Sequence, residues 1–153
     1  SVLDKHTKMT VYEPHMHAAG VRMCLDAIWE GKTETLSCAG YNHNWVRVYA
    51  FADDAAPLLP KGTILRITGY FDNTPTNPNV SDPRNWSGLG HRSIDNMMIN
   101  IGQANFLTDE EFATEVADRK ARLGLASGET VLGCMVCGFD ELPALSNANN
   151  NDN

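Results

Sequence analysis

Alternating apolar and polar residues run through the first two-thirds of the chain and predict β-strands. Between residues 21 and 29, Val21, Met23 and Leu25 begin an apolar series, and polar residues such as Asp26 lie between its members. Residues two apart share one face of a strand, so this segment is predicted to be a half-buried strand. Further strands are expected at residues 33–38, 44–51, 63–71 and 94–102. Short strands without intervening helices predict an all-β fold, an antiparallel β-sandwich of the jelly-roll type.

The segment between residues 72 and 91 is rich in Asn, Pro, Asp and Gly and predicts a long surface loop. Its carboxylates and amides could hold calcium, but residues 72–85 lack the spacing of an EF-hand. A loop built from Asx turns is therefore favoured.

A helix is predicted over residues 109–123, because the pattern changes to helical spacing after Thr108. Thr108 and Glu111 form a capping-box sequence, and Gly124 suits the C-terminal end. Beyond the helix lie a Cys-x-x-Cys segment and an Asn-rich tail that is expected to be disordered. We therefore divide the chain into a sandwich domain at 1–105 and a C-terminal appendage of helix, cysteine segment and extended, flexible tail at 106–153.

Length and charge narrow the classes of function. The 153 residues suit one domain, and 12 Lys+Arg against 19 Asp+Glu give a formal charge of −7. This charge disfavours nucleic acid as a partner, and no apolar run is long enough for a direct membrane span. Because the chain begins with Ser1, we expect that a leader was removed or that the chain was cut from a longer one.

The four cysteines allow several arrangements. Cys24 and Cys38 are equidistant from Gly31 in the sequence. A symmetric hairpin with a three-residue connection would therefore place them opposite each other, close enough for a disulfide. A shift of the strand register by one residue would instead leave two free thiols. Cys134 and Cys137 favour a local disulfide in an exported protein, and a four-cysteine zinc site is the alternative. Disulfides point to an extracytoplasmic location, periplasmic or secreted.

The sequence His15-Met16-His17 is the sharpest candidate for chemistry. On a strand both imidazoles point to the same face and can converge on one metal, while Met16 points away. A soft thioether added to two imidazoles would select copper. Solvated surface histidines are the alternative. Candidates for a third ligand are His6, His43, His91, Met97 and Met98.

Five segments together resemble one known family. In chain order they read PHMHAAG (14–20), YNHNW (41–45), LPKGT (59–63), YFDNTPTNPN (70–79) and IDNMM (94–98). They resemble the C-terminal catalytic domain of the copper type II, ascorbate-dependent monooxygenases, which include the peptidylglycine alpha-hydroxylating and dopamine beta-hydroxylating enzymes, and are most similar to bacterial stand-alone versions. The resemblance implies one copper ion held by His15, His17 and Met97, with Met98, on the opposite face, as the second choice for the thioether.

Several positions depart from that family. Glu13 stands where the family has a substrate-binding arginine, and Ile99 and Ile101 stand where it has asparagine and tyrosine. Asp95 and Asn96 replace an acidic pair. The family's partner domain, which carries a second copper, has no counterpart among these residues. Peptidylglycine hydroxylation by this chain alone is therefore not expected.

Two functions remain as hypotheses. The first is an extracytoplasmic, copper-binding, monooxygenase-like domain whose site at His15, His17 and Met97 activates oxygen or exchanges electrons. If it is an enzyme, it is an oxidoreductase whose electrons come from ascorbate, a cytochrome or another chain. The second is a non-catalytic subunit that docks through the same sandwich into a larger, membrane-associated complex.

Overall fold

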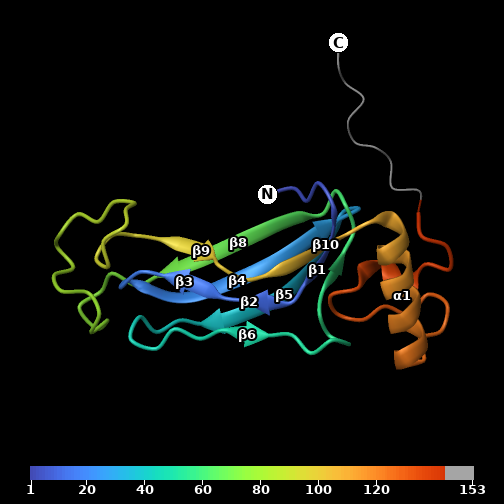
Figure 1. The fold of residues 1–153 in the computed structure, drawn as a ribbon. Helices are drawn as coiled ribbons and strands as arrows, with labels where there is room; N and C mark the ends of the chain where they lie inside the picture. The colour runs from blue at the N-terminus through green and yellow to red at the C-terminus, as the bar shows by residue number, and fades with distance from the viewer. Residues whose placement is uncertain (144–153) are drawn as a thin grey trace, which may run out of the picture.

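The computed structural model describes residues 1–143 and is built mainly from strands (Figure 1). The Asn-rich tail expected to be disordered lies outside these residues. No helix in the described part of the chain is long and apolar enough to cross a membrane. In chain order the elements are β1 (His6–Met9), β2 (Val11–Tyr12), β3 (Pro14–Met16), β4 (Gly20–Trp29), β5 (Lys32–Gly40), β6 (Tyr49–Ala50), β7 (Leu58–Leu59), β8 (Ile64–Phe71), β9 (Met98–Asn100), β10 (Ala104–Leu107), α1 (Asp109–Leu123) and the 3-10 helix η1 (Met135–Gly138).

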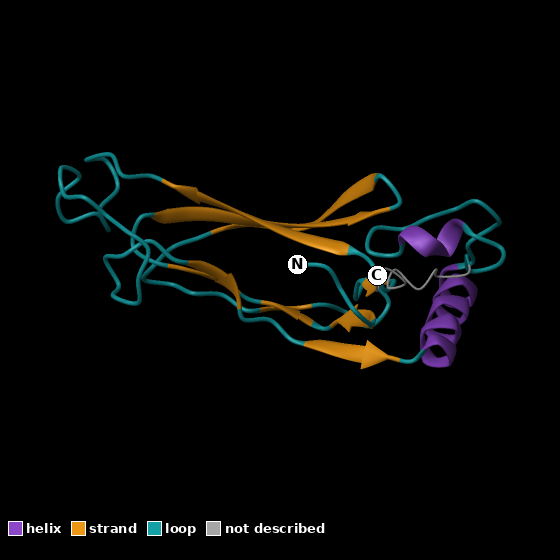
Figure 2. Ribbon diagram, turned by 90° about the horizontal axis from the view of Figure 1, so that it is seen from above, coloured by secondary structure: helices purple, strands orange, loops and turns teal. Residues whose placement is uncertain are grey.

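The strands form two layers that face each other (Figure 2). The three longest make one antiparallel sheet in the order β5-β4-β8, and the short strands pair antiparallel as β10-β1-β7, β2-β6 and β3-β9. Met23, Leu25, Ala27 and Trp29 of the apolar series of β4 are buried, whereas Val21 is 38% exposed. Cys24 and Asp26 on the other face are buried as well, so β4 is more deeply buried than the predicted half-buried strand. The Tyr12 hydroxyl donates a hydrogen bond of 2.9 Å to the Met23 carbonyl, which ties β2 to β4 across the core.

The β4–β5 hairpin brings Cys24 and Cys38 together by a route that differs from the expected one. Trp29 pairs with Lys32, so the connection has two residues, both with positive φ, and not three. Leu36 is an extra residue that forms a β-bulge, which shifts the register by one and sets Cys24 opposite Cys38. The disulfide is present.

Cys134 and Cys137 form a second disulfide at the start of η1. The local bridge favoured from the sequence is therefore confirmed. Because all four cysteines are in disulfides, the four-cysteine zinc alternative is wrong.

Two predicted strands are much shorter than expected. In residues 44–51 only Tyr49–Ala50 pairs, because continuing the β2–β6 ladder would require a donor at Pro14, which has no backbone N–H. In residues 94–102 only Met98–Asn100 is strand. The Asp95 carboxylate accepts hydrogen bonds from Arg92, and this contact folds the preceding residues into a turn.

The predicted loop and helix are confirmed. Residues 72–91 form turns and bends apart from a single bridge at Leu89, and Asx turns such as Asp72 to the Thr74 N–H hold them. The helix α1 has the predicted bounds, the Thr108/Glu111 capping box and a left-handed Gly124 at its end.

The helix α1 covers one end of the sandwich and buries polar residues of β1 (Figure 1). The Phe112 ring stacks on His6 with centroids 4.2 Å apart. The buried Arg119 donates to the backbone oxygens of Ala56 and Asp53 at 2.6 and 2.9 Å.

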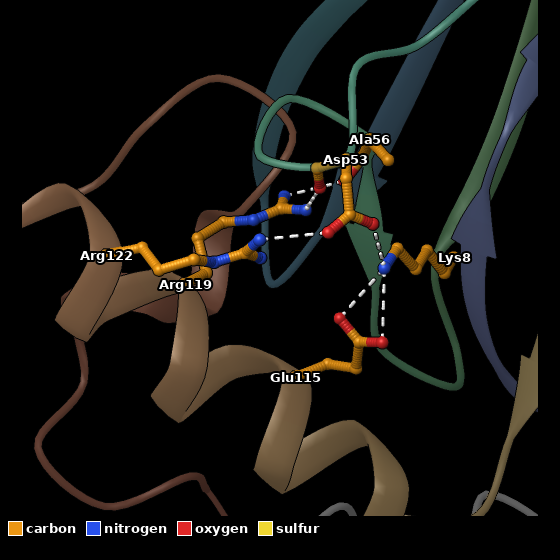
Figure 3. A network of polar contacts seen from close by, with 6 residues as sticks. All are labelled: Lys8, Asp53, Ala56, Glu115, Arg119 and Arg122. Atoms are coloured by element: carbon orange, nitrogen blue, oxygen red, sulfur yellow. Dashed lines mark hydrogen bonds and ion pairs between the residues drawn. The ribbon is translucent and has the colours of Figure 1, made fainter.

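A charged network fixes the same helix to β1 (Figure 3). The Lys8 ammonium lies 2.7 Å from Asp53 Oδ1 and 2.9 Å from Glu115 Oε2, and Arg122 lies 2.9 Å from Asp53 Oδ2. The helix is thus attached to β1 by both apolar and charged contacts.

Candidate metal centre

The His-x-His pair lies on β3 and the residue after it, at the end of the sandwich opposite α1 (Figure 1). His15 is half-buried, and His17 is buried. Their ring centroids are 5.5 Å apart and the rings are nearly perpendicular, at 78°. The two imidazoles therefore share one face, as strand periodicity predicts.

This separation fits two ligands of a single ion. With a metal–nitrogen bond of about 2.0 Å, a metal lies about 3.2 Å from the centre of a ligating imidazole ring. Two such rings at a tetrahedral angle have centres about 5.2 Å apart, close to the separation of His15 and His17.

A hydrogen bond fixes the orientation of the His17 ring. Its Nδ1 lies 3.2 Å from the Asp95 carbonyl oxygen, which can only accept, so Nδ1 carries the proton and Nε2 keeps its lone pair. Arg92 holds Asp95 through a contact of 2.7 Å between Nη2 and Oδ1, and this hydrogen bond lowers the pKa of the Asp95 carboxyl. The turn at Asp95 thus orients the His17 ring and leaves Nε2 as the nitrogen that could bind a metal.

The register between β3 and β9 separates the two methionines. His15 pairs with Ile99 and Met16 with Met98, and the His17 N–H bonds to the Met97 carbonyl at 3.3 Å. Residues opposite each other in an antiparallel pair point to the same face. Met97 therefore shares the face of the histidine pair.

Met98 lies on the other face, toward β8, and is 45% exposed. A Cβ added to Gly69 of β8 would come within 2.6 Å of Met98 Sδ and 3.1 Å of Met16 Cε. Met98 thus packs with Met16 against the opposite layer, away from the imidazoles.

His43 approaches the pair from the loop after β5. Its ring centroid lies 6.5 Å from that of His17, and its Nδ1 is buried without a hydrogen-bond partner. Rings on opposite sides of one ion have centres at most about 6.4 Å apart, so His43 would have to move to share a metal with His17.

The two remaining histidines lie elsewhere. His6 stacks under α1, where Nδ1 accepts from the Lys61 N–H at 3.1 Å and Nε2 lies 3.2 Å from Asp109, and burial lowers its pKa. His91 is exposed in the long loop. Neither meets the His15–His17 pair.

Sequence reasoning missed one residue that supports β3. The Tyr41 hydroxyl donates a hydrogen bond to the carbonyl of Met16, between the two histidines. Burial raises the pKa of Tyr41. The motif YNHNW contains this tyrosine, but only the folded chain shows what it contacts.

Across residues 1–143 no three His, Cys, Asp or Glu side chains converge as a metal-binding group. A site of two imidazoles and one thioether is not a group of that kind. Comparison of the chain with family models, with curated proteins and with solved structures gives no match, so the resemblance to the copper monooxygenases stays a prediction.

Proposed function

We propose that this chain is a copper-binding, monooxygenase-like domain with a jelly-roll type of sandwich, in which His15, His17 and Met97 hold one copper ion. The observation that carries the proposal is the separation of 5.5 Å between two imidazoles on one strand face. The register that sets Met97 opposite His17 supports the third ligand.

The chain's own residues have distinct roles in this proposal. His17 binds through Nε2 because the Asp95 carbonyl engages Nδ1. The thioether of Met97 is a soft donor and favours Cu(I) over Cu(II). A copper ion held by these three ligands would supply one-electron and oxygen chemistry.

We place this function outside the cytoplasm. Two disulfides, with no free cysteine in the described residues, suit an oxidising compartment such as the periplasm or the extracellular space. Electrons for the copper would come from a small reductant or another protein.

The test is copper stoichiometry and affinity in the purified chain, measured separately for Cu(I) and Cu(II). We expect one copper per chain, lost in His15→Ala and in His17→Ala. Met97→Ala should weaken the binding of Cu(I) more than that of Cu(II), because it removes the soft donor.

Two control variants make the test specific. Met98→Ala removes a thioether one position away on the opposite face and should leave Cu(I) affinity unchanged. His43→Ala tests the neighbouring third imidazole in the same way. Binding that survives loss of His15 and His17, or a larger effect of Met98→Ala than of Met97→Ala, would contradict the proposed ligand set. A chain that takes up no copper would leave the docking subunit as the function.

A further inference from the structure

The face that carries the proposed copper ligands is lined with exposed apolar side chains. Ile99 pairs with His15, and Ile101 donates its N–H to the carbonyl of Glu13, so both isoleucines point to the same side as the imidazoles. They are 48% and 50% exposed. These two half-exposed isoleucines therefore form an apolar surface beside His15.

More exposed apolar side chains lie in the segment that leads into β6. Val46 and Val48 of this segment are 44% and 58% exposed. β6 pairs with β2, the strand directly before β3 in the chain.

The strand positions of this face carry one charged side chain, and it is negative. Among the described residues at positions 11, 13, 15 and 17 of one strand and 97, 99, 101 and 103 of the other, Glu13 is the single Asp, Glu, Lys or Arg. The guanidinium of Arg92, at the His17 end, is paired with Asp95. An anionic ligand on these positions would meet the Glu13 carboxylate.

We infer that the substrate of the copper site is an uncharged, apolar compound that lies on Ile99 and Ile101 beside His15. This inference rests on the proposed function, because it names the substrate class of the same site. Contact with the isoleucines buries apolar surface of both partners, and Glu13 discriminates against carboxylates.

The inference can be tested by NMR on protein with labelled isoleucine methyl groups, metal-free and loaded with diamagnetic Cu(I). The probes are 4-phenylbutanamide and 4-phenylbutanoate, which match in size and differ in charge. We expect the amide to shift the methyl signals of Ile99 and Ile101 and to leave that of Ile28, in β4 of the other layer, unchanged. The carboxylate should bind about tenfold more weakly, and Glu13→Gln should narrow this difference.

Matched variants locate the site. Ile99→Asn and Ile101→Asn should each weaken amide binding about tenfold. Ile64→Asn changes an isoleucine that is 43% exposed on β8 and should have no effect. The folded state of each variant is checked by its dispersed methyl spectrum.

The outcomes separate the two proposals. Copper binding without amide-induced shifts at Ile99 and Ile101, or equal binding of amide and carboxylate, would overturn the substrate inference and leave the copper site standing. Amide-induced shifts in a chain that binds no copper would overturn the copper proposal and leave an apolar ligand site. Shifts at both isoleucines in a chain that also binds Cu(I) support both.

Discussion

Replacing Tyr12 by phenylalanine should lower stability at neutral pH and have almost no net effect at alkaline pH. Tyr12 is fully buried, and its hydroxyl donates to the Met23 carbonyl of the other layer. Losing one buried hydrogen bond costs about 1 kcal/mol of unfolding free energy. Tyr12→Phe should therefore be about 1 kcal/mol less stable than the wild type at pH 7.

The pH dependence follows from the raised pKa of the same phenol. Burial, and secondarily the neighbouring Tyr49, raise the pKa of Tyr12 from 10.0 to about 12. Between these values the unfolded chain loses the proton and the folded chain keeps it, so the unfolding free energy falls as pH rises. At pH 11 this loss is about 1.4 kcal/mol for the wild type and is missing in Tyr12→Phe.

The assay is urea denaturation followed by tryptophan fluorescence at pH 7, 10 and 11. All four cysteines are in disulfides, so no free thiolate is present to catalyse disulfide exchange in alkali. Tyr70→Phe changes a tyrosine that is 41% exposed and should match the wild type within about 0.5 kcal/mol throughout. A difference between wild type and Tyr12→Phe that stays constant from pH 7 to pH 11 would refute the reasoning.

Three further perturbations test other parts of the fold. Gly102→Ala would place a Cβ against the backbone carbonyl of Val11, and we expect a loss of about 1–3 kcal/mol in urea denaturation; an unchanged midpoint would contradict this packing. Glu30 has φ of 50° in the β4–β5 turn, so Glu30→Asn should raise stability by about 0.5–1 kcal/mol, and a lower melting temperature would count against the turn. Hydrogen bonds from Lys8 and then Arg122 lower the pKa of Asp53 to about 2, so the stability that Asp53 contributes is present above pH 4 and is lost as pH falls through 2. Lys8→Met should show a smaller drop in melting temperature between pH 5 and pH 2 than the wild type, and an equal drop would exclude the Lys8 contact as the cause.

The elements that the sequence predicts are those whose own residues carry a recognisable pattern. The strands β4, β5 and β8 have long alternating runs, and α1 has a capping box and a terminal glycine, so their positions follow from neighbouring residues. β1, β7 and β10 are not predicted. β1 contains Thr7 and Lys8, whose polar side chains indicate an exposed segment, yet both residues are buried. The residues of α1 that contact His6 and Lys8 lie about a hundred positions later in the chain.

The candidate site divides in the same way. That His15 and His17 share a face follows from strand periodicity alone. The position of Met97 depends on the register between strands about 80 residues apart, which only the fold provides. His43 and Tyr41 reach the site from a loop, and no periodic pattern predicts where a loop side chain points.

The pairing of β1 also has a consequence for the order in which the chain folds. Its partners follow it by about 50 residues in β7 and about 100 in β10, so β1 cannot complete its sheet until most of the chain has been synthesised. At about 5–20 residues per second, this delay is about 5–20 seconds. Through that interval the charged side chain of Lys8 keeps an unpaired strand hydrated and resists its association with other chains. The lysine that finally bonds to Asp53 and Glu115 is thus also suited to protect the nascent protein from aggregation.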